Sequence, residues 1–194
     1  MAGAELERVI FPAQAEGLLR GLHPDVDDAL ASKLKTLALD PSQPFPPAWP
    51  SSRLKEWLDA ISDVIYDSCT RDEAHRRIGR RFIDGWQRTM LGAASAQLLK
   101  VLGTRRALER LTRAFRTGDN YTESSVSFPG QTVALVTVRS EPLPHYIAGV
   151  LDGGLALLNV KGRVAIESVS GDVMVFRIEW EGGLHEEAAA VRAR

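Results

Sequence analysis

The period at which apolar residues recur changes once along this chain, near residue 120. Before that point, apolar side chains are spaced by three and four residues, as over Arg53–Tyr66, which is typical of a helix. After it they alternate with polar ones, as over Thr132–Val138 and Val173–Trp180, which is typical of strands. The sequence therefore predicts an α+β fold, in which an N-terminal helical part packs on a small antiparallel sheet.

The order of the predicted elements refines this fold. Strands over Val126–Phe128 and Thr132–Val138 precede a helix over His145–Leu158, and strands over Val164–Ser168 and Val173–Trp180 follow it. The sheet part thus has the order strand, strand, helix, strand, strand. The helices predicted before it cover Ala13–Leu22, Asp25–Leu37, Arg53–Tyr66, Arg71–Leu102 and Thr104–Arg116.

Two stretches interrupt the helical part. Asp40–Pro50 holds five prolines, which fix an extended backbone and predict a stiff surface segment. The longest predicted helix carries Gly79, Gly85 and Gly92 in its interior. Because each glycine costs a helix about 1 kcal/mol relative to alanine, these three indicate close helix packing or a break near Gly92.

Length and composition predict one domain. The chain has 194 residues, of which 44% are hydrophobic, enough to bury a core without disulfides. We expect residues 1–181 to form this domain, mainly helical over 1–120, and the polar, alanine-rich 182–194 to be a flexible tail. The N-terminus lacks the pattern of a signal peptide, and every apolar run is far shorter than the roughly 18 residues of a membrane span. A cytoplasmic location without a membrane span is expected.

Basic residues gather in the middle of the chain. Residues 70–120 carry twelve basic side chains against five acidic ones, although the whole chain has a net charge of −1. This cluster is either a solvated helical face paired with acidic flanks, or a site for an anion or an acidic partner. Arg77, Arg81 and Arg88 form the candidate anion or partner patch, because Arg80 has Asp84 four residues on as its partner. The pI of about 6.4 and the lack of a recognition motif indicate no nucleic-acid binding.

No catalytic signature is present. The sequence has no Walker loop, no GxSxG, no HExxH and no CxxC, and its single cysteine, Cys69, excludes a disulfide framework. No two histidines are spaced for a shared metal ion, so no metal site is predicted. His75 precedes Phe82 and Trp86 on a predicted helix, where it could ligate haem, but the arginines beside it favour a surface position. We therefore predict no catalytic residue and no cofactor, haem included.

Four segments together resemble a known family. They are Leu39–Trp49, Ile78–Trp86, Arg113–Tyr121 and Tyr146–Leu155. With them the chain is similar, from Ile10 to Trp180, to a paralogous family of unknown function that is expanded in myxobacteria. That family has no established activity, so the resemblance implies none.

A more distant resemblance concerns the fold. The strand–strand–helix–strand–strand order, ending in Val173–Trp180, resembles that of haem–nitric-oxide-binding domains, the 4-vinyl reductase domain and the small TRAPP subunits. This resemblance implies a pocket between helices and sheet for haem, a small molecule or an acyl chain. Two motifs are missing: Tyr121–Ser125 does not supply the Tyr-x-Ser-x-Arg of the haem-binding members, and Glu167–Phe176 has no cysteines. We therefore expect neither haem nor the cysteine-dependent chemistry of the 4-vinyl reductase domain.

These observations predict a non-enzymatic sensor or adaptor that binds a small ligand, a protein partner or both in signalling. The alternative is a small-molecule enzyme that uses the same pocket between helices and sheet. We predict that the pocket, unless it is a filled core, lies where the longest helix faces the helix on the sheet. Its candidate residues are Phe82, Trp86, Met90, Tyr146, Val150 and Leu151.

A protein partner is also expected. Val173–Trp180 is apolar and ends in a large aromatic residue, so an edge position in the sheet would need covering. The basic middle and the acidic remainder of the chain can attract one another between copies. A homodimer or a foreign protein partner is therefore predicted.

Overall fold

The α+β prediction is confirmed by a computed structural model, which describes residues 7–181. The tail prediction for residues 182–194 concerns residues outside this range. The helices are α1 (Pro12–Leu22), α2 (Asp28–Thr36), α3 (Ser52–Ile65), α4 (Arg71–Trp86), α5 (Met90–Leu102), α6 (Thr104–Leu108), α7 (Leu111–Phe115) and α8 (Pro144–Leu157). The strands are β1 (Val9–Ile10), β2 (Trp49–Pro50), β3 (Glu123–Gly130), β4 (Val133–Arg139), β5 (Gly162–Ser170) and β6 (Val173–Trp180).

The main sheet has four antiparallel strands in the order β3-β4-β6-β5. Its register pairs Val136 with Phe176, and every second side chain of β4 and β6 is buried. β6 is therefore an interior strand, and the expectation that Val173–Trp180 lies at an edge is wrong. Its apolar residues need cover on one face because they form the core under α8, not because an edge is open.

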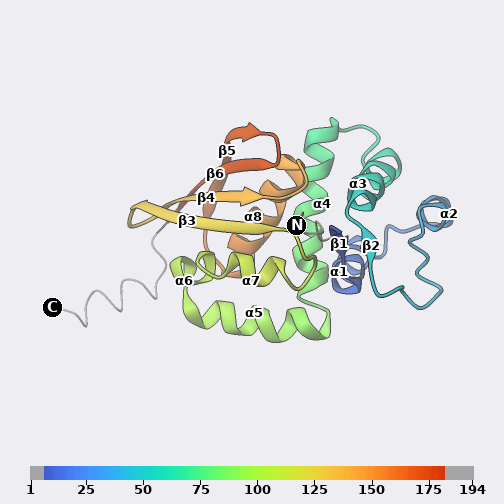
Figure 1. Cartoon of the computed structure of the whole chain (residues 1–194), viewed down its shortest axis with the longest axis horizontal. Coiled ribbons are helices and arrows are strands. Elements are labelled where there is room, and N and C mark those ends of the chain that lie inside the picture. The colour runs from blue at the N-terminus through green and yellow to red at the C-terminus, as the bar shows by residue number, and fades with distance from the viewer. Residues whose placement is uncertain (1–6, 182–194) are drawn as a thin grey trace, which may run out of the picture.

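α4 is the central helix of the molecule. Figure 1 shows it between the sheet with α8 on one side and α1 to α3 on the other, while α5, α6 and α7 run below the sheet. The close approach of α1 depends on glycine, since a Cβ on Gly85 would collide with the backbone oxygen of Gly17. Small residues thus bring α1 and α4 into direct backbone contact.

The helix predicted over Arg71–Leu102 is broken in two. α4 ends at Trp86 and α5 begins at Met90, and Thr89 caps α5 by accepting a hydrogen bond from the Gly92 nitrogen at 3.0 Å. The Thr89 hydroxyl also donates to the Trp86 oxygen at 2.8 Å. A Cβ on Gly92 would collide with that same oxygen, so glycine here permits the sharp turn that precedes it.

The last helix predicted before the sheet, Thr104–Arg116, is also divided, into α6 and α7. The proline-rich segment Asp40–Pro50 is extended, as predicted, apart from turns near its start. Trp49 anchors it: the ring is buried against Trp57, and its Nε1 donates to the Ala38 oxygen at 2.7 Å. Among the helices of residues 7–181, none has the length and apolar character needed to cross a membrane.

Candidate functional site

A partly enclosed cavity of about 100 Å³ lies between α4 and α8 on one side and α5 to α7 on the other. Its wall is mostly apolar. The helical residues in that wall include Phe82, Ile83 and Trp86 of α4, Leu99 of α5, Leu108 of α6, Leu111 and Phe115 of α7, and Tyr146, Val150, Leu151 and Leu155 of α8. The site is thus built mainly from the five helices α4 to α8, and Thr122 and Ser140, which lie next to β3 and β4, complete it.

Five of the six predicted pocket residues lie in this wall. They are Phe82, Trp86, Tyr146, Val150 and Leu151. Met90 does not, since its side chain is 87% exposed. The turn between α4 and α5 places Met90 on the outer surface, whereas an unbroken helix would have continued the inner face.

The cavity also has a polar end that the sequence analysis missed. Asp119 is buried there, and its carboxylate accepts hydrogen bonds from the Thr122 nitrogen at 2.7 Å and the Tyr121 nitrogen at 3.0 Å. The Thr122 hydroxyl donates to the same carboxylate at 2.7 Å and lies 2.8 Å from the Ser140 hydroxyl. Burial raises the pKa of the Asp119 carboxyl above its ordinary value. No sequence motif joins these residues, because the fold brings Asp119 and Ser140 together from separate loops.

Tyr146 carries the one polar atom of the cavity wall that is both buried and unpaired within residues 7–181. Its side chain is 2% exposed, and its ring lies 6.1 Å from that of Phe82, centroid to centroid. Gln14, in the same wall, lies close enough to the hydroxyl to lower its pKa slightly, but it makes no hydrogen bond of normal geometry with it. Burial raises the pKa of Tyr146 above its ordinary value, so the phenol stays protonated and can donate.

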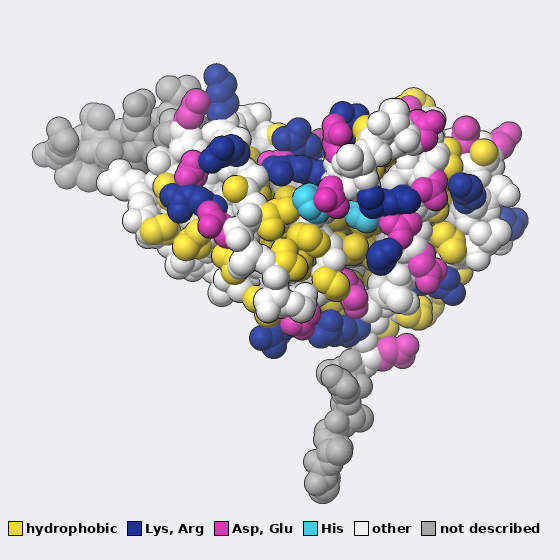
Figure 2. All heavy atoms as spheres, turned by 90° about the horizontal axis from the view of Figure 1, so that it is seen from above, with side chains coloured by type: hydrophobic (Ala, Val, Ile, Leu, Met, Phe, Trp, Pro, Cys, Tyr) yellow, Lys and Arg dark blue, Asp and Glu magenta, His cyan; other side chains and the backbone are white. Residues whose placement is uncertain are grey.

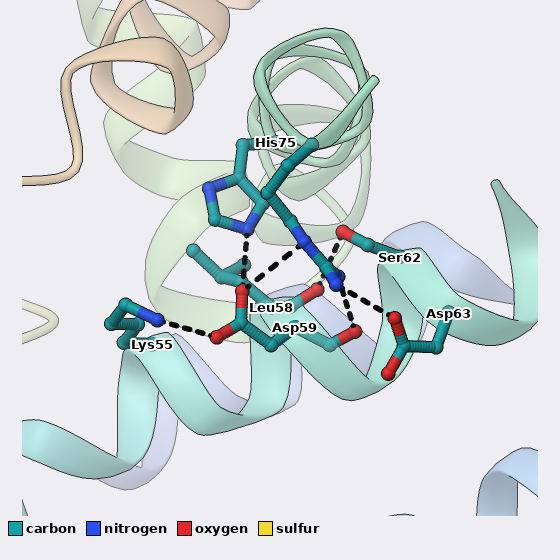
Figure 3. A network of polar contacts seen from close by, with 7 residues as sticks. Lys55, Leu58, Asp59, Ser62, Asp63 and His75 are labelled. Atoms are coloured by element: carbon teal, nitrogen blue, oxygen red, sulfur yellow. Dashed lines mark hydrogen bonds and ion pairs between the residues drawn. The ribbon is translucent and has the colours of Figure 1, made fainter. Parts of the chain in front are cut away.

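His75 lies away from the cavity, on the side of α4 that packs against α3. Its Nε2 is 3.2 Å from Oδ1 of Asp59 (Figure 3), and burial lowers its pKa. Lys55 and Arg71 contact the same carboxylate, at 2.6 Å and 3.7 Å. The histidine therefore joins two helices and has no access to the pocket.

The residues of the cavity do not fit haem. Over the described residues, the wall contains no histidine, cysteine or methionine, which are common axial ligands of haem. Tyrosine is a further axial ligand, but burial keeps the two tyrosines of the wall, Tyr121 and Tyr146, protonated. It also contains no lysine or arginine to pair with the propionates. Residues 7–181 likewise hold no cluster of three His, Cys, Asp or Glu side chains that would bind a metal ion.

The three arginines of the predicted anion patch each bind a different part of the protein. Arg77 pairs with Glu73 one turn away, and Arg88 donates to the Asp84 backbone oxygen at 2.9 Å. Arg81 caps the end of α1, where it donates to the backbone oxygens of Gly21 and Leu22 at 2.9 Å and 2.8 Å and pairs with Asp25 at 2.6 Å. On the face seen in Figure 2, basic and acidic side chains are intermixed. The structure therefore does not bring these arginines together into one open cationic site.

The predicted Arg80–Asp84 pair is replaced by a longer-range one. Arg80 and Arg76 both donate to Oδ2 of Asp152 on α8, at 3.2 Å and 2.7 Å, and the Asp152 side chain is only 4% exposed. α4 and α8 are thus held by charge as well as by packing, which fixes two walls of the cavity.

Solved structures with a similar fold are H-NOX domains. One is an oxygen-binding H-NOX domain related to soluble guanylate cyclases, in its oxygen complex (13% identity, TM-score 0.65, covering 89% of this chain and 93% of that one). Another is an H-NOX protein from S. oneidensis in the Fe(II)NO ligation state (9%, 0.67, 88% and 99%). A third was described for modulation of haem redox potential by porphyrin distortion (13%, 0.64, 88% and 93%). At these identities the likeness establishes the shared fold, as the sequence resemblance predicted.

No curated protein matches the sequence. A family profile, described as "Protein of unknown function (DUF2378)", matches residues 8–181, nearly the whole length that the structure describes. This agrees with the predicted family of unknown function. The chain belongs to the DUF2378 family.

Proposed function

We propose that this chain is a non-enzymatic sensor domain that binds a small, uncharged and largely apolar ligand in the cavity between α4, α8 and α5 to α7. The observation that carries the proposal is the Tyr146 hydroxyl, buried in the wall without a partner. An unpaired buried hydroxyl costs about 1–3 kcal/mol. A ligand with one hydrogen-bond acceptor would remove that cost.

The electrostatics of the wall favour a neutral ligand. The described wall residues include no basic side chain, so a buried anion would lack a counterion. Asp119 at the polar end would repel an anion further, and its hydrogen bonds to its own turn leave it poorly placed to receive a cation. The volume of about 100 Å³ compares with the ~150 Å³ of an engineered apolar cavity that admits benzene. A small ketone, ether or ester fits this description.

The residues of the cavity wall also support the proposal that the protein binds no haem, despite its H-NOX-like fold. Iron would need one of the two tyrosines as its ligand, yet burial raises the pKa of both Tyr121 and Tyr146. The propionates would meet the Asp119 carboxylate rather than a basic side chain. The fold is thus proposed to serve a different ligand from that of its structural neighbours.

An enzymatic role finds less support. General acid–base catalysis requires a donor and a base that face one reacting group. Tyr146 supplies a donor, but the Asp119 carboxylate already accepts from the Tyr121 and Thr122 nitrogens and the Thr122 hydroxyl. A binding function therefore accounts for the cavity more completely than a reaction does.

Two measurements test the proposal. Native mass spectrometry and an absorbance scan of protein purified from its own host should show a small neutral adduct and no Soret band. Thermal melts with butanone should then show stabilisation, whereas butanoate and butylamine, which are similar in size, should not stabilise the fold. A Soret band, or equal stabilisation by all three compounds, would contradict the proposal.

A further inference from the structure

The outer face of α5 is apolar and exposed. Of the five large hydrophobic side chains exposed within residues 7–181, four lie on this helix: Met90 (87% exposed), Leu91 (56%), Leu98 (51%) and Val101 (85%). Their spacing of seven and eleven residues places them on one side of a helix with 3.6 residues per turn. Figure 1 shows α5 along the outside of the molecule, with α6 and α7 on its inner side.

The fold itself does not use this face. α5 packs inward through Gly92 and Ala96, both buried, and through Leu99, which lines the cavity. The exposed stripe, completed by Ala94, therefore contributes nothing to the core that residues 7–181 form. Contiguous apolar surface of this kind marks an interaction site.

The chain that forms α5 and the two helices after it is strongly basic. Residues 88–118 contain seven basic side chains and a single acidic one, Glu109. Within the described part of the chain, no carboxylate lies within ion-pair distance of Arg88, Lys100, Arg106 or Arg110. This differs from α4, whose arginines pair with Glu73, Asp25 and Asp152. A partner of α5 is thus expected to bring negative charge.

We infer that α5 docks an amphipathic helical segment of another protein, with an apolar stripe flanked by acidic residues. A helix is the favoured shape because the stripe is straight, one helix wide and 13 residues long, and because Ala93 and Ala94 let a second helix approach closely. A second copy docking through the same face would place two basic surfaces against each other. A membrane surface is less suited, since α5 has no aromatic residue to anchor it at the interface.

This docking requires no ligand in the cavity, so its test stands apart from that of the proposed function. The probe is a stapled helical peptide of 13 residues, with Leu along one side and Glu on both flanks, and its twin carries Lys in place of each Glu. Fluorescence anisotropy with the full chain should show the Glu peptide binding at least about tenfold more tightly than the Lys twin. Raising the salt from about 50 mM to about 500 mM should weaken the Glu peptide by a similar factor.

Two variants locate the site. Leu98→Gln/Val101→Gln should weaken the Glu peptide by at least about tenfold and leave the melting temperature unchanged, because both side chains are exposed. Val169→Gln is the matched control, since Val169 is 47% exposed but lies on β5, and it should bind as the wild type does. Arg106→Glu/Arg110→Glu should reverse the preference between the two peptides.

Four results would overturn the inference. The first is absent or equal binding of the two peptides. The second is a dimer in sedimentation that Leu98→Gln/Val101→Gln dissolves, which would make a second copy the partner. The third is binding to phosphatidylcholine–phosphatidylserine vesicles that the same variant abolishes while the Glu peptide fails to bind. The fourth is a rise in peptide affinity on Leu184→Gln in the full chain, which would make residues 182–194 the natural occupant.

Discussion

Gly79 of α4 and Gly149 of α8 meet where these two helices cross, and a Cβ on Gly79 would lie 3.0 Å from the Cα of Gly149. That Cβ would also collide with the backbone oxygen of Tyr146, and a Cβ on Gly149 would collide with that of Arg76. Backbone atoms cannot rotate away as side chains do, so the helices would have to separate. The close approach of α4 and α8, which form two walls of the cavity, therefore depends on the absence of a side chain at Gly79 and Gly149.

We predict that Gly79→Ala and Gly149→Ala each destabilise the fold by about 2–4 kcal/mol. Gly154→Ala, also on α8, is the control, because no atom lies within 4 Å of the added Cβ. It should be neutral or stabilising by up to about 1 kcal/mol, the helix propensity gained. Urea unfolding of the three variants measures this, and equal midpoints would show that the helices can shift without cost.

Tyr146→Phe is expected to have opposite effects on stability and on binding. Removing the unpaired hydroxyl from the cavity wall should stabilise the ligand-free protein by about 1 kcal/mol. The same change removes the donor for the ligand, and a neutral hydrogen bond of about 1 kcal/mol corresponds to a loss of about fivefold in affinity. Chemical unfolding and calorimetric titration on one preparation measure both. A variant that is less stable without ligand would indicate that the hydroxyl already has a partner.

The sheet was predictable because its side chains alternate. Met174 and Phe176 are buried on β6 as the pattern required, and α8 covers them. The position of β6 inside the sheet could not be predicted, since an apolar run fits an interior strand and a covered edge equally well. Only the pairing of β6 with both β4 and β5 decides it.

The apolar wall of the site was predictable from the sequence, whereas its polar end was not. Helical spacing predicted the wall residues on α4 and α8, because those stripes face inward along each helix. The polar end depends on contacts between distant segments: Ile10 bridges Asp119, and Thr122 reaches Ser140. Met90 was misplaced because helix propensity continues through the turn that Thr89 caps.

Acid should destabilise the fold partly through His75. Burial holds its pKa below the ordinary value, so the unfolded chain takes up a proton more readily than the native one. Its contribution to stability is thus present at neutral pH and is lost as the pH falls below about 6.5. His75→Gln should flatten the dependence of the unfolding free energy on pH over that range. An unchanged pH dependence in the variant would show that Asp59 compensates fully for the charged histidine.

The cavity and the outer face of α5 share one helix, so their ligands should influence each other. Leu99 lines the cavity, whereas Leu98 and Val101 point outward one residue before it and two after it. A ligand that fills the cavity would support α5 from within, and we expect slower hydrogen exchange of the backbone amides of α5 to α7 when it binds. If that support also favours docking, the ligand should raise the affinity of the chain for the acidic peptide. By linkage, the peptide must then raise the affinity of the chain for the ligand by the same factor.

Leu99→Ala should remove this coupling, although each molecule still binds alone. Titrations of each in the presence of the other measure the two factors, and independent binding in the wild type would show that α5 transmits nothing between its two faces.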